Sequence, residues 1–184
     1  TLVAAAYMIG FYHPASAIAE AKEKRTLEAV LLTPATPLEV IGADAVVAAL
    51  VSAVTGLVAL GVFGTIPPKL PLLAAGFLFA LLLAISLGTL IGLTARDQRS
   101  AGVLSGGAMI VLLLLTVLPW LDFAPAVWAV MRWLPTRPVM ELMLEASGFE
   151  VETPAWQSIL VMLPYVAAAM TAAIRQVRRQ AVNR

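Results

Sequence analysis

Residues 70–95 read LPLLAAGFLFALLLAISLGTLIGLTA, a run of 26 residues without one Asp, Glu, Lys or Arg. A helix needs about 20 apolar residues to cross the hydrocarbon core of a bilayer. Four other charge-free runs, each 19 to 24 residues long, occupy residues 1–19, 45–68, 100–121 and 153–174. This repeated pattern predicts an all-α polytopic membrane protein.

The composition excludes several other classes of protein. Of the 184 residues, 61% are hydrophobic and 12% are charged, whereas a soluble domain has about 25% charged residues. Too few charges remain to cover a soluble globule, so we exclude an ordinary soluble enzyme and a disordered tail. A net charge of +1 argues against a nucleic-acid partner, which requires a concentrated basic face. The absence of cysteine and the single histidine predict no disulfide and no metal site.

The charged residues divide the chain into one transmembrane domain over residues 1–184. We expect five spans, at about residues 1–19, 41–63, 70–94, 101–118 and 155–174. The chain opens at Thr1 directly in apolar sequence, so we expect that an N-terminal part is missing. The longest segment between spans, 119–153, combines several prolines with large apolar residues. We interpret it as short amphipathic or re-entrant helices on the extracytoplasmic face.

The basic residues set the orientation of the spans. Nine of the twelve Lys and Arg residues lie in segments 20–39, 95–100 and 175–184, which the predicted spans place on one side. Because cytoplasmic loops carry the excess of Lys and Arg, we predict that these three segments are cytoplasmic. The four tryptophans fall at or beyond the opposite boundary, where tryptophan favours the headgroup layer. We therefore expect a multi-pass protein of the cytoplasmic membrane.

The sequence contains few candidates for residues that bind ATP, catalyse a reaction or conduct ions. No G-x-x-x-x-G-K-[ST] motif occurs in it, so this chain has no P-loop for ATP. His13 and Ser105 are the only conceivable Ser–His pair, and Ser105 follows Leu104 where an approach glycine would be expected; we predict no catalytic residue. Asp44 and His13 lie near span ends. For each, a structural interfacial role is favoured over an ion or proton path.

Small residues recur inside the spans. Gly88 and Gly92 form a GxxxG motif, and Gly102 and Gly106 form another. Association of helices in lipid relies on close approach of their backbones, which glycine permits. We interpret both motifs as general helix-packing sites, with a contact between two copies of the chain as the alternative.

A short cytoplasmic helix is predicted between the first two spans. Leu27, Val30 and Leu31 stand at i, i+3 and i+4 and make an apolar stripe. Pro34 and Pro37 end the helix, because proline lacks the N–H donor and disfavours a helical residue before it. The predicted helix, residues 26–33, has eight residues, which are too few to cross a membrane. From the residues alone, the stripe fits either a helix on the membrane surface or one docked in a groove of a partner protein.

The sequence EAKEKRTLEAVLLTP at 20–34, continued by PLEVIG at 37–42, resembles the cytoplasmic segment of ABC type 2 exporter permeases. In that family a span ends in an E-x-E-x-GTLE-x-LL-x-TP pattern before the next span begins. The five predicted spans resemble the second to the sixth of the six in the family. Two positions depart from the pattern: Arg25 stands where glycine is frequent, and Asp44 where lysine is common. Arg25 bears on how the short helix is presented, and Asp44 weakens the expectation that position 44 binds a lipid headgroup.

The resemblance implies a permease subunit of an ATP-driven exporter, working as a homo- or heterodimer with two copies of a cytoplasmic ATPase. No cofactor is expected in this chain; ATP and Mg²⁺ belong to the ATPase, which a coupling helix contacts. The coupling residues carried over from the family pattern are Glu23, Arg25, Thr26, Leu27, Glu28, Val30, Leu31, Leu32, Thr33 and Pro34.

Uncharged spans favour an amphipathic, hydrophobic or lipid-linked cargo and direct contact with membrane lipid. One alternative is a membrane scaffold subunit that docks a partner through residues 20–39 without transport. A gradient-driven carrier is disfavoured, because ion-coupled carriers need ionisable groups at the membrane midplane and the spans lack them.

Overall fold

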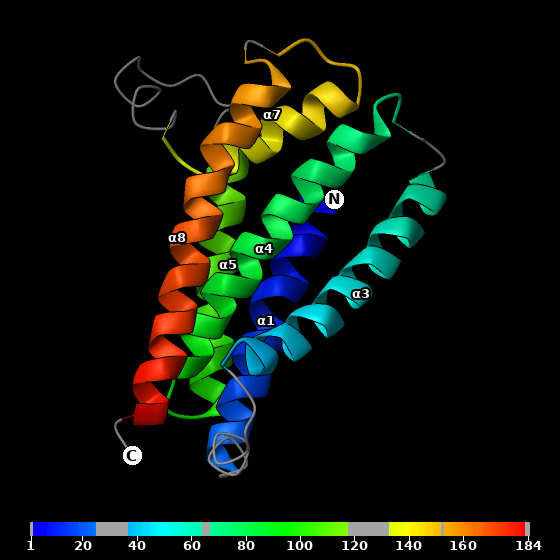
Figure 1. The fold of residues 1–184 in the computed structure, drawn as a ribbon. Coiled ribbons are helices and arrows are strands. Elements are labelled where there is room, and N and C mark those ends of the chain that lie inside the picture. The colour runs from blue at the N-terminus through cyan, green and yellow to red at the C-terminus, as the bar shows by residue number, and fades with distance from the viewer. Residues whose placement is uncertain (1, 25–36, 64–66, 118–132, 152, 183–184) are drawn as a thin grey trace.

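The computed structural model describes residues 2–24, 37–63, 67–117, 133–151 and 153–182. In these ranges the regular structure consists of six helices, which Figure 1 labels: α1 Leu2–Glu23, α3 Pro37–Phe63, α4 Leu70–Thr94, α5 Gln98–Val117, α7 Thr136–Ala146 and α8 Ala155–Val182. Four of them, α3, α4, α5 and α8, are long and apolar enough to cross a membrane. The prediction of an all-α polytopic membrane protein is confirmed.

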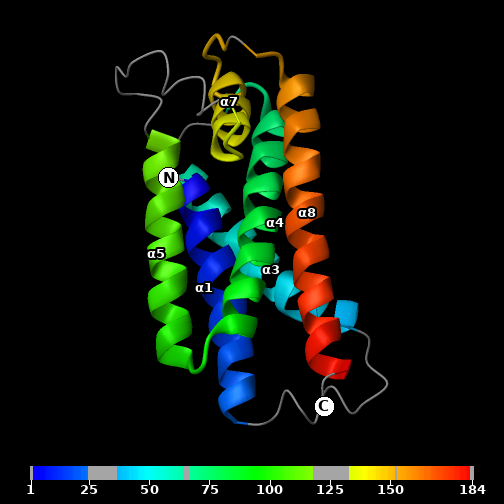
Figure 2. The ribbon, with the colours of Figure 1, turned by 90° about the vertical axis from the view of Figure 1, so that its left-hand side faces the viewer.

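The helix over the first predicted span, α1, is not among those four. Tyr7, Tyr12, His13 and Ser16 interrupt its apolar sequence. The structure gives a physical reason why these residues are tolerated, because α1 packs against α3, α4 and α5 and lies between α5 and α4 in Figure 2. A helix largely surrounded by protein need not be as apolar as one that faces lipid. That α1 crosses the membrane stays a prediction.

Small residues bring α1 and α4 into close contact. A Cβ added at Gly88 would lie 2.6 Å from the carbonyl oxygen of Phe11, and one at Gly92 would lie 2.8 Å from that of Ala15. From the opposite helix, a Cβ at Gly10 would lie 2.7 Å from Ala84 Cβ. The backbones of the two helices therefore touch along this line, as small-xxx-small packing in membranes allows.

The second glycine motif faces more open space. A Cβ at Gly102 would meet only Tyr12 Cε2, at 3.8 Å, and a Cβ at Gly106 would meet nothing within 4 Å. The two GxxxG motifs of the sequence thus have different surroundings in the fold. Gly88 and Gly92 are covered by α1, whereas α5 carries Gly106 on an open surface.

The segments predicted to share one side of the membrane lie at the same end of the bundle. The last residues of α1, the turn between α4 and α5 and the end of α8 meet there (Figures 1 and 2). We call this the basic end, because its described residues include Lys22, Lys24 and five arginines, at 96, 99, 175, 178 and 179. The opposite end, which we call the α7 end, carries α7 across the helices (Figure 1).

Polar contacts fasten α7 to its neighbours. Glu141 is 8% exposed; its Oε1 accepts from Arg137 Nε at 2.8 Å and Thr153 Oγ1 at 3.1 Å, and its Oε2 accepts from Ser158 Oγ at 3.1 Å. The Nζ of Lys69, at the start of α4, pairs with Glu145 Oε1 at 2.9 Å. The hydrogen bonds and this ion pair join α7 to both α4 and α8. An amphipathic helix was predicted within 119–153, and α7 is such a helix; residues 118–132 lie outside the described residues.

Candidate functional site

The predicted coupling segment, residues 20–39, starts at the basic end of the bundle. α1 ends at Glu23, whose side chain is exposed. The other predicted coupling residues lie outside the described residues: Arg25, Thr26, Leu27, Glu28, Val30, Leu31, Leu32, Thr33 and Pro34. What the structure describes is therefore the support of that segment, where α1 meets the turn between α4 and α5.

Lys22 binds the end of α4. Its ammonium donates to the carbonyl oxygens of Ala95 at 2.5 Å, Leu93 at 2.9 Å and Gly92 at 3.5 Å. The last four carbonyls of a helix have no partner within the helix. Ile91 O is satisfied separately, because the Ala95 amide donates to it at 2.8 Å. A positive charge here also offsets the partial negative charge at a helix C-terminus. Lys22 is thus a side-chain cap supplied by another helix.

Glu23 contacts the start of α5. Its Oε2 accepts from the backbone N–H of Gln98, the first residue of α5, at 3.4 Å. The Gln98 side chain in turn donates from Nε2 to Ser16 Oγ of α1 at 2.9 Å. Free N–H groups and a partial positive charge mark a helix N-terminus, so a carboxylate is favourable there. Two adjacent residues of opposite charge therefore hold the two helix ends that flank the turn.

The turn is also stabilised from within. The Ser100 backbone N–H donates to Asp97 Oδ1 at 2.7 Å, and the Asp97 N–H donates to Ser100 Oγ at 3.2 Å. This reciprocal pair is a capping box for α5, with Ser100 in the place usually taken by Glu or Gln. The hydrogen bond from the Ser100 backbone is the main reason that the pKa of Asp97 lies below 3.8.

The capping box predicts that the hydrogen bonds at the start of α5 weaken in acid. Because the pKa of Asp97 is lower in the folded protein than in the unfolded chain, its stabilisation is present above pH 3.8 and is lost as the pH falls below it. We expect the hydrogen-exchange protection of the Ser100 amide to fall when the pH drops from 5 to about 3. In Asp97→Asn, which accepts the same bond without a charge, protection should stay nearly constant. An equal loss of protection in both proteins would refute the role of this carboxylate.

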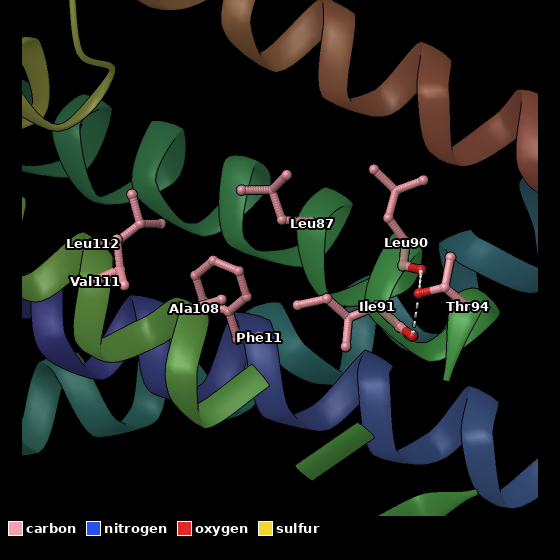
Figure 3. Close-up of a pocket in the computed structure, with 8 residues that line it drawn as sticks. All are labelled: Phe11, Leu87, Leu90, Ile91, Thr94, Ala108, Val111 and Leu112. Atoms are coloured by element: carbon pink, nitrogen blue, oxygen red, sulfur yellow. Dashed lines mark hydrogen bonds between the residues drawn. The ribbon is translucent and has the colours of Figure 1, made fainter. Parts of the chain in front are cut away.

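Two apolar grooves run beside α4. One, of about 400 Å³, lies between α4 and α5 and reaches Phe11 of α1 (Figure 3). Its one hydroxyl, on Thr94, donates back to the carbonyls of Leu90 and Ile91, 3.0 Å from each. The second, of about 300 Å³, lies between α3 and α4 toward the α7 end and is lined by apolar residues such as Leu57 and Phe77. Neither groove is lined by a charged side chain. Among the described residues no cluster of three or more His, Asp or Glu could hold a metal.

Sequence reasoning missed the contacts of Lys22 and Gln98. Both lie in polar segments that the sequence identifies only as outside the membrane. Lys22 and its acceptors are 70 to 73 residues apart in the chain, and no local spacing predicts a contact over that separation. The one available signal is general: a cation close to the membrane boundary, where the free carbonyls of another helix also lie.

Comparison with known proteins adds one finding. The sequence matches the family described as "ABC-2 family transporter protein" over residues 1–175. No curated protein matches it.

Proposed function

Because this chain belongs to the ABC-2 family of transporter proteins, we propose that it is the permease subunit of an ATP-driven exporter. It is a multi-pass membrane protein and a membrane component of a transporter. The proposal adds the direction of transport, the energy source and the class of cargo. Within the 184 residues there is no P-loop, so ATP and Mg²⁺ would be bound by separate ATPase subunits, two per pair of permeases.

One observation carries the ATPase partnership. α1 ends at Glu23, at the basic end of the bundle, as do the α4–α5 turn and the end of α8 (Figure 1), and most of the predicted coupling residues follow Glu23 directly in the sequence. Cytoplasmic loops carry the excess of Lys and Arg, so this end would face the cytoplasm. The apolar stripe of Leu27, Val30 and Leu31 would then sit where a soluble ATPase can bind it.

The grooves favour an apolar cargo. Both lie between helices of crossing length, and their linings present apolar side chains. Small-molecule sites usually place a few polar groups to orient a polar ligand, and the only hydroxyl in the first groove is bonded to its own helix. We therefore propose an amphipathic, hydrophobic or lipid-linked substrate rather than a small ion.

A pull-down tests the partnership. The tagged protein, extracted from its host membrane in mild detergent, should co-purify with a P-loop ATPase in equal copy number. Replacing Leu27 and Leu31 together by Asp should reduce the recovered ATPase by about tenfold or more, because each leucine would lose its apolar contact. Membrane insertion of the variant should be unchanged.

Ala35→Asp is the matched control. It adds one negative charge to the same segment outside the predicted coupling residues, and should leave ATPase recovery near that of the unaltered protein. Undiminished recovery with the double leucine variant would contradict the proposal. Recovery of a partner that does not hydrolyse ATP would support a scaffold subunit instead.

A further inference from the structure

The α4–α5 turn is held by two adjacent charges of α1. Lys22 donates three hydrogen bonds to the carbonyl end of α4, and Glu23 accepts one from the amide end of α5. Each charge matches the sign that its helix end favours. We call Lys22, Glu23 and the groups they contact in residues 92–98 the turn clamp. Four alanines pack beneath it, at positions 15 and 19 of α1 and at 95 and 101 beside the turn, so the backbones are close.

The turn clamp lies at the start of the predicted coupling segment, residues 20–39. α1 is helical through Glu23, which is itself one of the predicted coupling residues, and the other nine begin at Arg25, three positions after Lys22 in the sequence. A rigid helix end transmits a displacement of the segment that follows it. The alanine contacts alone would let α1 slide past the turn, because alanine side chains are small and their contacts are non-directional. Charge-assisted hydrogen bonds to fixed carbonyls are directional and resist such sliding.

We propose that Lys22 is a positioning residue for ATP-driven transport: its ammonium links the coupling segment to the α4–α5 turn, so that one movement of the ATPase shifts two spans together. The inference rests on the proposed function. It assigns Lys22 a role that the family pattern of the coupling segment does not give it. A displacement of α1 would then be transmitted to the ends of α4 and α5 through the turn clamp.

Two cysteine reporters can follow this movement, because the chain has no cysteine of its own. Arg96→Cys, at an exposed position in the turn, reports on the turn, and Ala29→Cys reports on the coupling segment. Each is placed singly in the complex of permease and ATPase. The rate of labelling by a maleimide is compared without nucleotide and after trapping with MgATP and vanadate. In the otherwise unaltered complex, trapping should change the labelling rate at both positions.

Lys22→Met keeps the length of the side chain and removes its donors. We expect the ATPase to co-purify and the reporter at position 29 to respond normally, while the response at position 96 falls by about tenfold, the size expected for loss of charge-assisted hydrogen bonds. A protein that merely misfolds would lose both responses. Lys22→Arg retains a cation and donors and should restore the response at position 96.

Lys24→Met is the matched control, because Lys24 is exposed and pairs with Glu20 across one turn of the same helix at 2.5 Å. Both reporters should respond in this variant. If Lys22→Met cannot be recovered, Lys22→Leu, which likewise removes every donor, replaces it in the same comparison. A full response at position 96 in the variant that is used would overturn the inference and leave the proposed function standing. No response at position 29 in the complex with Lys22 intact would overturn both.

Discussion

Replacing Gly88 by valine is expected to lower the free energy of unfolding by about 3 kcal/mol, the upper range for overpacking a close contact. A Cβ at this position would lie 2.6 Å from Phe11 O and 2.8 Å from Gly10 O. Both atoms belong to the backbone of α1, which cannot rotate away as a side chain can. The added atoms would therefore push α1 and α4 apart. Titration of the protein in mixed micelles with SDS, followed by circular dichroism, measures the change.

Gly106→Val supplies the matched comparison. The same atoms are added to a glycine within a helix of crossing length, but at a position with nothing within 4 Å of the added Cβ. Its free energy of unfolding should stay within about 0.5 kcal/mol of that of the unaltered protein. Equal losses in the two variants would show that the contact between α1 and α4 is not the cause.

Glu141→Ala should lower the free energy of unfolding by a similar amount, about 3 kcal/mol. The carboxylate is almost fully buried and accepts bonds from Arg137, Thr153 and Ser158. Its removal takes away the ion-pair partner of a largely buried guanidinium and two hydroxyl contacts that fasten α7 to the start of α8. Breaking one member of such a pair costs more than the pair itself contributes, because the other charge stays in place. The SDS titration gives this free energy as well.

A double-variant cycle isolates the ion pair from the other contacts. Arg137→Ala combined with Glu141→Ala should cost clearly less than the sum of the two single changes, since no unmatched charge remains. Glu150→Ala, at an exposed position of the same end, should change stability by less than about 0.5 kcal/mol. Additive single effects would mean that the two side chains act independently.

The sequence predicts the positions of the long apolar helices well, because a bilayer requires length and apolarity of every lipid-facing helix. The expected starts and ends of the spans at 70–94 and 155–174 lie close to α4 and α8, although α8 continues to Val182. α1 shows the limit of this reasoning. Residues 1–19 carry no charge, but α1 is not among the four helices that are apolar enough to cross. Its environment is largely other helices, and no local pattern states which helix will be central.

The candidate site was predictable only in part. The coupling segment could be located from its own residues, since the family pattern that it matches is local in the sequence. The contacts of Lys22 with Leu93 and Ala95 could not be predicted, because they depend on how α1 crosses α4. That crossing in turn depends on which GxxxG motif is buried. Gly88 and Gly106 look alike in the sequence, and their neighbours in space separate them.

The close contact between α1 and α4 has a consequence for synthesis at the ribosome. Gly10 of α1 contacts Ala84 of α4, more than 70 residues later in the chain. α1 therefore leaves the ribosome well before its main partner exists, with tyrosines and a histidine that enter lipid reluctantly on their own. Stable placement of α1 must await the arrival of α4 at the translocon, so α1 is made before the helix that secures it.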